Sequence, residues 1–318
     1  MDAKPSPTLA PQIVVLGSLN MDLVARMERL PRAGETVSGQ TFETIAGGKG
    51  ANQAVAAARM GARVVLIGRL GDDAFGGVLR QNLAAEGVDT SYVWETRGCA
   101  SGVALICVDQ TGANAIAVVP GANGQLSESD LVACSATIAG AKALIVQLET
   151  PLATVAAAIR IAQQHGVLTV LDPAPAPQSR LPRELLGVAI LSPNQSEAEA
   201  LTGIRVDDWQ SAEAAAGELQ RQGAKDVVLK MGSLGALVCR GDGTTQRVLA
   251  SSAEIVDTTA AGDAFTAAMT VALCEGQSLI DAARIGCIAG TLTCTRFGAQ
   301  PALPTRAEVE AYATAALV

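Results

Sequence analysis

The sequence has very little histidine and few aromatic residues. Of its 318 residues one is a histidine, His165, and only 3% are aromatic. A metal site built on two histidines is therefore excluded, and a Ser-His-Asp hydrolase would depend on His165 alone. His165 stands directly before Gly166, where a helix is expected to end, and a structural role at that helix end is the simpler interpretation. We therefore expect the proton acceptor of any acid-base chemistry to be a carboxylate.

Positive charge is scarce as well. The chain has 23 lysine and arginine residues against 31 aspartate and glutamate residues, a net charge of −8. Without a basic surface, neither nucleic acid nor an anionic membrane is an expected partner. This charge balance excludes polyanionic polymers but not nucleotides, because backbone amides, Mg²⁺ and a few cations can hold the phosphates of a nucleotide.

Signals for export, membrane insertion and disulfide formation are also missing. Residues 1–11 contain three prolines and no apolar stretch, and no later segment has the roughly 18 uncharged apolar residues of a membrane span. The seven cysteines are odd in number and form no C-x-x-C motif, which is typical of small buried thiols. We therefore expect a cytoplasmic protein with a disordered leader over residues 1–11.

Apolar residues and glycine, by contrast, are abundant. The chain is 49% hydrophobic and has 32 glycines, a composition typical of a buried parallel sheet flanked by helices. We expect one α/β domain over residues 12–318, with a mostly parallel central sheet. The expected strands are 12–16, 63–67, 143–148, 167–171, 188–191 and 226–230, and the expected helices are 49–60, 74–86, 151–165, 197–201, 209–222, 261–274, 278–293 and 305–317.

Two further segments are expected to form a small β-sheet outside the main one. Residues 22–46 contain short alternating stretches around Pro31 and Gly34, which predict a hairpin. The short strands of residues 91–119 could complete either this hairpin or the edge of the main sheet. We assign both segments to a β lid.

Common catalytic motifs are absent: there is no P-loop, no G-x-G-x-x-G after the first strand, no G-x-S-x-G and no H-E-x-x-H. What remains is a run of small residues, Thr258 to Gly262, that opens an apolar helix. The free amides of such a helix start can bind an anion. Asp263 in the first turn could simply complement the helix dipole. Beside a bound phosphate, it could instead accept the proton of an attacking hydroxyl.

Polar residues that suit a sugar occur near other expected strand ends. Asn20 and Asp22 follow the first strand, Asn52 follows the Gly47-Gly48-Lys49-Gly50 run, and Glu149 follows strand 143–148. Their amides and carboxylates could pair with vicinal hydroxyls, and open α/β sheets bind ligands at this edge. The glycine run could also be only a turn. Asn194 and Glu197 follow another strand, where they could form a helix cap or contribute to a site.

These residues form a recognisable set. The segment Gly47–Ala54, the Asn194-x-x-Glu197 pair and the Asp257–Asp263 segment resemble the two signatures and the N-x-x-E motif of the PfkB (ribokinase) family of carbohydrate kinases. The resemblance extends from about residue 12 to the end of the chain. It implies a three-layer α/β sandwich with a β lid and ATP-dependent phosphorylation of D-ribose at its 5-hydroxyl. Alternatives are a family kinase for deoxyribose, fructose, pseudouridine or a nucleoside and, more distantly, a non-catalytic sugar-binding protein of the same fold.

The resemblance also implies a role for individual residues. Asp263 would be the proton acceptor, and the anion hole would comprise the amides of Ala260, Ala261 and Gly262. Ribose would be held by Asn20, Asp22, Gly48, Lys49, Asn52, Glu149 and Asp263. ATP would contact Asn194, Lys230, Met231, Gly232, Ser233, Leu234, Gly235, Gly262, Asp263 and Cys287. Mg²⁺ would be oriented through water by Glu197, and an activating K⁺ would lie at Asp257, Thr259, Thr293, Arg296, Gly298 and Ala302.

Two nucleotide positions depart from the family pattern. Cys287 stands where a histidine is usual near the adenine, and Lys230 stands where a threonine is usual. A thiol packs and donates only weakly, so both departures bear on nucleotide selectivity rather than on the reaction. The resemblance further implies a homodimer formed through the lid.

Overall fold

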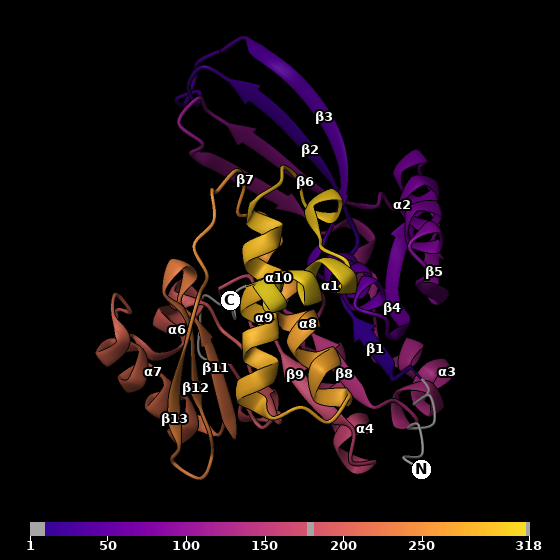
Figure 1. Cartoon of the computed structure of the whole chain (residues 1–318). Helices are drawn as coiled ribbons and strands as arrows, with labels where there is room; N and C mark the ends of the chain where they lie inside the picture. Colours follow the sequence, from indigo (N-terminus) through magenta and orange to yellow (C-terminus); the bar gives the residue numbers. More distant parts are fainter. Residues whose placement is uncertain (1–9, 177–180, 316–318) are drawn as a thin grey trace, which may run out of the picture.

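The computed structural model describes residues 10–176 and 181–315. Its main sheet has the strand order β13-β12-β11-β10-β9-β8-β1-β4-β5 (Figure 1). The strands are β1 (Gln12–Leu16), β4 (Arg63–Gly71), β5 (Asp89–Thr96), β8 (Ala143–Val146), β9 (Leu168–Leu171), β10 (Ile190–Leu191), β11 (Asp226–Lys230), β12 (Gly235–Cys239) and β13 (Thr245–Leu249). Neighbours from β11 to β5 pair parallel, and only β12 and β13 pair antiparallel. The expected mostly parallel sheet is confirmed.

Helices cover both faces of this sheet. Because side chains alternate along a strand, Val14 and Leu16 of β1 enter one apolar cluster and Ile13 and Val15 enter another. The first cluster includes residues of α3 (Glu128–Ala139), α4 (Leu152–Gln164), α5 (Arg183–Leu186), α6 (Gln195–Thr202) and α7 (Trp209–Gln222). The opposite face is covered by α1 (Lys49–Arg59), α2 (Ala74–Ala85), α8 (Ala261–Cys274), α9 (Leu279–Cys294) and α10 (Arg306–Ala315). The result is the three-layer sandwich.

A second sheet projects beyond the carboxyl ends of the main strands (Figure 1). It has the order β3-β2-β6-β7, from β2 (Asn20–Met27), β3 (Gly39–Gly47), β6 (Gly102–Val108) and β7 (Asn114–Val119). We call these four strands the lid. Asn20 and Asp22 therefore lie in the first lid strand, so any movement of the lid would carry both side chains with it.

The expected boundaries of the lid were partly wrong. Residues 89–96 form β5, which pairs parallel with β4 at the edge of the main sheet. The physical reason is apolar packing, since Val93 is buried and Tyr92 and Trp94 pack against the core. Helices α3 and α5 and the antiparallel hairpin β12–β13 were not expected from the sequence.

The ends of the chain differ from expectation in part. Of the leader expected over residues 1–11, residues 1–9 lie outside the described residues. Pro11, however, accepts a hydrogen bond from the Arg63 amide at 2.9 Å. The last helix was expected over residues 305–317; α10 spans Arg306–Ala315, and the expected end lies outside the described residues. Within residues 10–176 and 181–315, no helix is long and apolar enough to cross a membrane.

Close packing of glycines places the start of α1 against the end of β1. A Cβ at Gly50 would lie 2.5 Å from the carbonyl carbon of Gly17, a distance that no side chain tolerates. Gly48, directly before α1, has φ 89°, a left-handed conformation that favours glycine. This arrangement brings α1 to the carboxyl edge of the sheet, beneath the lid.

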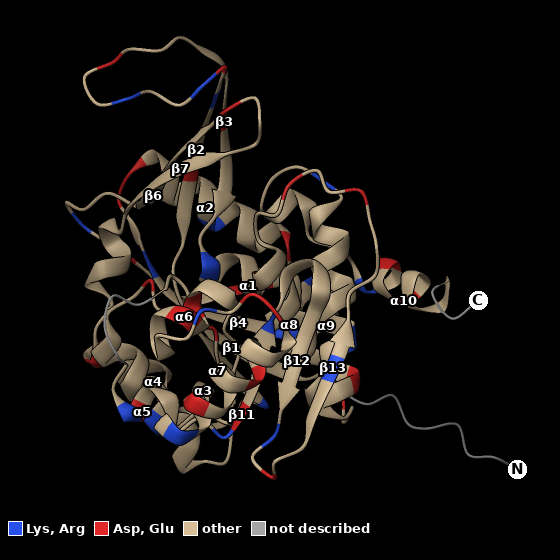
Figure 2. Cartoon of the chain, turned by 90° about the vertical axis from the view of Figure 1, so that its left-hand side faces the viewer, with Lys and Arg blue, Asp and Glu red and all other residues tan. Residues whose placement is uncertain are grey.

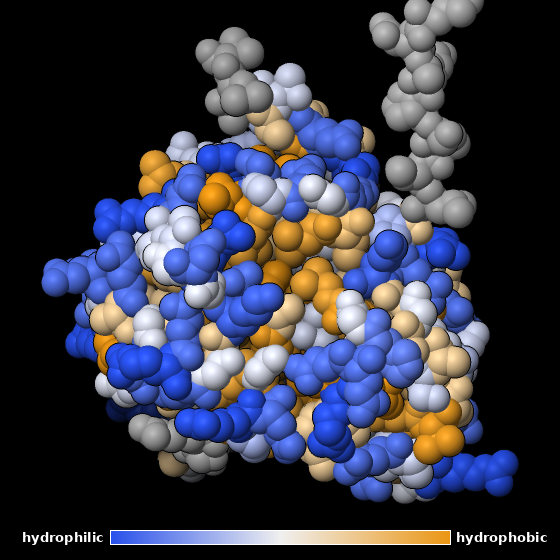
Figure 3. Space-filling view, turned by 90° about the horizontal axis from the view of Figure 1, so that it is seen from below, coloured by the Kyte–Doolittle hydropathy of each residue, from blue (hydrophilic) through white to orange (hydrophobic). Residues whose placement is uncertain are grey.

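Lys and Arg are interspersed with Asp and Glu on the side shown in Figure 2. The opposite edge of the sheet, seen from below in Figure 3, has hydrophilic side chains around smaller apolar patches. A hollow of about 450 Å³ at that edge is lined partly by the exposed Lys142 and Lys225. The polar residues predicted to bind ligands lie at the other edge, beside the lid.

Candidate active site

Asp263 occupies the first turn of α8 and is only 5% exposed. Its Oδ2 accepts a hydrogen bond from Asn52 Nδ2 at 3.0 Å, and its Oδ1 accepts one from Gln53 Nε2 at 2.9 Å. Burial raises the pKa of Asp263 to about 6, against the lowering influence of Lys49 and the two amide donors. A carboxylate with this pKa is ionised near neutral pH and is basic enough to accept a proton.

The backbone before Asp263 is unusual. Ala260 has φ 60°, a left-handed conformation that is uncommon for alanine, and it is the N-cap of α8. Within the described residues it is the only non-glycine residue with positive φ. Small side chains at Ala260, Ala261 and Gly262 leave the first amides of the helix accessible, and the adjoining helix dipole favours an anion.

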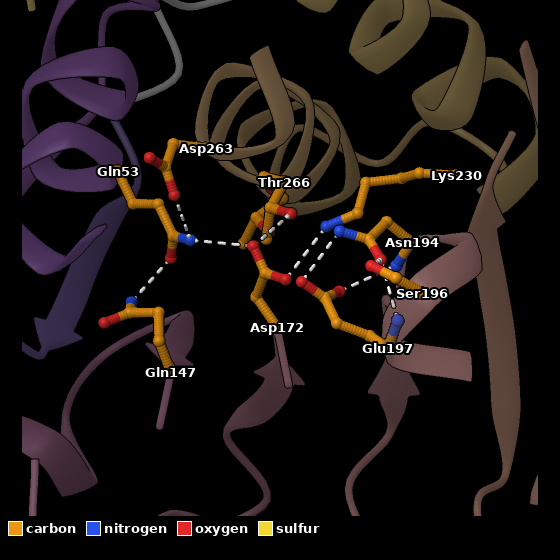
Figure 4. A network of polar contacts seen from close by, with 10 residues as sticks. Gln53, Gln147, Asp172, Asn194, Ser196, Glu197, Lys230, Asp263 and Thr266 are labelled. Atoms are coloured by element: carbon orange, nitrogen blue, oxygen red, sulfur yellow. Dashed lines mark hydrogen bonds and ion pairs between the residues drawn. The ribbon is translucent and has the colours of Figure 1, made fainter. Parts of the chain in front are cut away.

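A buried polar network extends from Asp263 through Gln53 to Asp172 and Lys230 (Figure 4). Gln53 Nε2 also donates to Asp172 Oδ2 at 3.0 Å, and Gln147 Nε2 donates to Gln53 Oε1 at 2.6 Å. Asp172 follows β9, and its Oδ1 lies 2.9 Å from Lys230 Nζ. Side chains from α1, α8 and the ends of three strands thus meet in one network.

The polar residues predicted to hold a sugar converge beneath the lid. Asn20 Oδ1 accepts a hydrogen bond from Asn123 Nδ2 at 2.8 Å. Asp22 packs so closely on Gly47 that a Cβ there would lie 2.3 Å from its carboxylate. Glu149 accepts hydrogen bonds from the Ser18 hydroxyl and, at 3.4 Å, from the Lys49 amide.

Electrostatic coupling links these residues to Asp263. Burial, together with the charges of Glu149 and Asp263, raises the pKa of Asp22 to about 7. Burial lowers the pKa of Lys49, but the carboxylates of Asp263 and Glu149 outweigh it and hold that pKa above its ordinary range. Lys49 therefore stays protonated and balances part of the negative charge at this edge of the sheet.

Asp263 and Lys49 also line a cavity of about 980 Å³. Of the predicted nucleotide residues, it is lined by Asn194, Lys230, Gly232, Ser233, Gly235, Gly262, Asp263 and Cys287, whereas Met231 and Leu234 are not part of the lining. Burial raises the pKa of the Cys287 thiol to about 12, so Cys287 is an uncharged, apolar part of the wall. Ile255, Phe265 and Ala253 add further apolar surface.

Asn194 and Glu197 form a capping box at the start of α6. Glu197 Oε2 accepts a hydrogen bond from the Asn194 amide at 2.7 Å, and Asn194 Oδ1 accepts one from the Glu197 amide at 2.8 Å. Burial raises the pKa of Glu197, with Lys230 opposing that change. Both carboxylate oxygens of Glu197 are engaged by Asn194, so Glu197 could reach a cation through water more readily than directly.

The predicted potassium positions lie around the start of α8. Asp257 accepts hydrogen bonds from the Thr259 amide at 2.9 Å and the Gly298 amide at 3.0 Å. Thr293 donates its hydroxyl to a helix carbonyl and Arg296 pairs with Glu308, while the Thr293 carbonyl accepts a hydrogen bond from the Arg296 amide at 3.3 Å. Ala302 is buried in the short 3₁₀ helix η3 (Gln300–Ala302). Over residues 10–176 and 181–315, no three His, Cys, Asp or Glu side chains cluster as metal ligands.

The geometry therefore combines a buried carboxylate, a helix start suited to an anion, a group of polar side chains beneath a lid and a large cavity. The profile of the pfkB family of carbohydrate kinases matches residues 10–306. The chain belongs to this family.

Relatives of this pfkB family member have been characterised by sequence and by structure. A ribokinase of Haemophilus influenzae is 41% identical over 297 residues, which cover 93% of this chain and 96% of the relative. A deoxyribokinase of Salmonella typhi is 37% identical over 253 residues, which cover 80% of this chain and 82% of the relative. The solved structure of Arabidopsis thaliana ribokinase complexed with ribose and ATP has a TM-score of 0.87 at 34% identity, covering 95% of this chain and 98% of that one.

Several polar residues of this pfkB kinase's site were not singled out from the sequence. They are Ser18, Gln53, Asn123, Gln147, Asp172 and Thr266, and each hydrogen-bonds a predicted site residue or the network around Asp263. Most of their partners lie some 90 to 210 positions away in the chain. Only Gln53 carried a signal, because it lies within the first family signature.

Proposed function

We propose that this chain transfers the γ-phosphate of ATP to the 5-hydroxyl of D-ribose, giving ribose 5-phosphate and ADP. The observation that carries the proposal is the position of Asp263, buried in the wall of the 980 Å³ cavity and hydrogen-bonded to Asn52, one of the polar residues predicted to hold the sugar. Phosphoryl transfer needs the attacking hydroxyl in line with the γ-phosphorus and within reach of a proton acceptor. A protein that only bound sugar would have no need of a buried carboxylate beside an anion site.

An unpaired atom supports a sugar in the pocket. Asn52 Oδ1 is buried and has no hydrogen-bond partner within the described residues. Buried polar atoms are normally paired, and a sugar hydroxyl would supply the missing donor. Asn20, Asp22, Gly48, Lys49 and Glu149 would complete the sugar site, and their polar side chains suit a fully hydroxylated pentose better than a nucleoside base.

In the proposed reaction, Asp263 accepts the proton of the 5-hydroxyl as that oxygen attacks the γ-phosphorus. The bond between this phosphorus and the bridging oxygen of ADP breaks. The amides of Ala260, Ala261 and Gly262 stabilise the charge on the phosphoryl oxygens. Lys49, which lines the same cavity, balances the negative charge of Asp263 before the proton moves.

The nucleotide would lie in the large cavity. Lys230, held by Asp172, would place a positive charge near Gly262, because a Cβ at Gly262 would lie 3.6 Å from Lys230 Nζ. Asn194 and the segment from Met231 to Gly235 would complete the contacts with the nucleotide. Cys287 would pack against the adenine as an apolar side chain, so selectivity for that base would rest on packing.

Two cations belong to this proposal. Glu197 would hold Mg²⁺ through water, and when bound Mg²⁺ neutralises charge on the nucleotide phosphates. K⁺ would lie beside the anion hole, at the backbone carbonyls of the Asp257, Thr259, Thr293, Arg296, Gly298 and Ala302 positions. Two further expectations stay predictions: a homodimer through the lid and a cytoplasmic location.

A coupled assay of ADP release, with ribose, 2-deoxyribose, fructose, adenosine and pseudouridine as acceptors, tests the proposed function. We expect ribose to have the highest kcat/KM, by roughly tenfold or more over deoxyribose, because a missing hydroxyl leaves site groups unpaired. A preference for 2-deoxyribose would assign the chain to the activity of its Salmonella typhi relative. No ADP release with any acceptor would reject the kinase assignment.

A further inference from the structure

Gln53 has no role among the predicted sugar and nucleotide contacts, yet it lies at the centre of the buried network. It follows Asn52 on α1 and is fully buried. Figure 4 shows its amide between Asp263, Asp172 and Gln147. Burying a side-chain amide costs free energy of folding unless each of its polar atoms forms a hydrogen bond. The hydrogen-bond partners of Gln53 therefore indicate its role.

The orientation of the Gln53 amide is determined by its neighbours. Its nitrogen has two hydrogens, and the two acceptors are Asp263 Oδ1 at 2.9 Å and Asp172 Oδ2 at 3.0 Å. Asp172 also pairs with Lys230 at 2.9 Å. Turning the amide over would place its oxygen against two carboxylates, and Gln147 donates to that oxygen at 2.6 Å in the observed orientation.

The two oxygens of Asp263 are consequently in different situations. Oδ1 is bound by Gln53, which has no exposure and no route to a ligand. Oδ2 is bound by Asn52, whose own Oδ1 is buried without a hydrogen-bond partner among the described residues. Because Asn52 belongs to the proposed sugar site, Oδ2 is the oxygen whose partner a sugar would contact, while Oδ1 is held by the fully buried Gln53.

We propose that Gln53 is a positioning residue that holds Asp263 by Oδ1 and thereby assigns Oδ2 as the atom that accepts the proton of the attacking hydroxyl. This inference rests on the proposed kinase activity. Gln53 also bridges Asp263 to Asp172, so one amide keeps two carboxylates apart and orders them at the same time.

The charges around Asp263 set the sign of the expected effect. Lys49 of α1 favours its ionised form, while Asp172 after β9 disfavours it. Asp22 of the lid also faces Asp263, whose charge contributes to raising the pKa of Asp22 to about 7. Gln53 and Asn52 donate to the ionised form and lower the pKa of Asp263. Removing Gln53 takes away one donor, so the ionised base should form only at higher pH.

The test compares the pH dependence of kcat for the wild type and Gln53→Leu, using the acceptor that the wild type phosphorylates best. We expect the acid limb of the Leu variant to lie about one pH unit higher. Because the pKa of Asp263 is about 6 in the wild type, the loss of kcat should be only about twofold at pH 7, approach tenfold at about pH 5 and disappear by about pH 9. KM for the sugar should change by less than about threefold.

Two controls separate positioning from packing. Gln222→Leu makes the same exchange at a partly buried glutamine on α7 that donates to Leu201 and Glu218, and it should leave the profile unchanged. Gln53→Glu keeps the shape, but its carboxyl must hold a proton to donate to Asp263. Gln53→Glu should therefore lose activity at alkaline pH. If Gln53→Leu does not fold, the pH dependence of Gln53→Glu tests the positioning role instead.

A titration of ¹³C-labelled aspartate by NMR gives a readout without turnover, with Asp263→Asn identifying the resonance. We expect the Asp263 resonance to titrate at higher pH in Gln53→Leu. An equal loss of kcat at every pH, or an unmoved Asp263 titration, would show that Gln53 is only structural. If instead the wild type phosphorylates no acceptor, the proposed function fails, while the NMR titration still tests the contact.

Discussion

At the scale of single residues, the site depends on which oxygen or nitrogen of a side chain faces the ligand. Asp263 has one oxygen toward Gln53 and one toward Asn52. Asn20 is similar, because Asn123 donates to its Oδ1 and leaves its Nδ2 for a sugar hydroxyl. The buried amides of Gln53 and Asn123 thus determine which atoms of Asp263 and Asn20 are left to contact a ligand, although neither amide needs to touch the ligand itself.

Substituting the proposed proton acceptor tests the chemistry most directly. Asp263→Asn keeps the shape but removes the base, so kcat should fall by about 10² to 10⁴, while the Kd for ribose should change by only a few-fold. Because the pKa of Asp263 is about 6, and only the ionised form accepts a proton, wild-type kcat should rise with pH through that value. Steady-state kinetics and calorimetric sugar binding measure both. A variant with near-normal kcat would contradict the assignment.

The orientation of Asn20 can be tested through Asn123→Asp. The new carboxylate would face Asn20 Oδ1 and the Leu19 carbonyl, which both accept hydrogen bonds from Asn123 in the wild type. Asn20 should turn over and present its oxygen to the sugar, which raises KM for ribose by roughly tenfold. KM for ATP is the internal control and should not change. Equal changes in both KM values would indicate a general loss of structure.

At the scale of elements, part of the fold follows from local patterns and part does not. Strands such as β1 and β8 and helices such as α1 and α8 are apolar segments with clear ends, and the sequence predicts them well. The alternating residues of β5 suit either sheet, and the sequence pattern led us to predict this strand in the lid. The packing of Val93 against the core places it in the main sheet instead. The sequence could not assign roles to Gln53 and Asn123. The role of a buried side-chain amide depends on its hydrogen-bond partners, and the partners of these two residues are distant in the sequence.

The start of α8 and the end of α9 form one unit. Asp257 bonds the amides of Thr259, just before α8, and Gly298, just after α9. A monovalent cation bound to the surrounding carbonyls would order the amides that receive the phosphate. Replacing K⁺ by tetramethylammonium, which is too large for such a site, should lower kcat by roughly tenfold. Assays at constant ionic strength that also include Na⁺ and Cs⁺ measure how kcat depends on the size of the cation. A kcat that is the same with every cation would contradict the predicted potassium site.

At the scale of the whole molecule, the lid carries apolar side chains that the described residues leave exposed. Leu105 and Ile116 are 47% and 55% exposed, and the strand register places them on opposite faces of the lid. Phe42, Val118 and Val119 extend this surface. Apolar side chains gathered on both faces of a small sheet are typical of a surface that is buried by a partner.

The proposed homodimer predicts that charge on the lid separates the subunits. Leu105→Lys combined with Ile116→Lys should weaken self-association by at least about a hundredfold, because each buried aliphatic side chain contributes roughly 2 kcal/mol. Sedimentation should show the wild type at twice 32.3 kDa and the variant at 32.3 kDa. Val132→Lys, at a 77% exposed position on α3 away from the lid, is the matched control and should stay dimeric. Since Asn20 and Asp22 belong to the lid strand β2, the separated subunits should also bind ribose more weakly. A wild type that sediments as a monomer would refute the dimer.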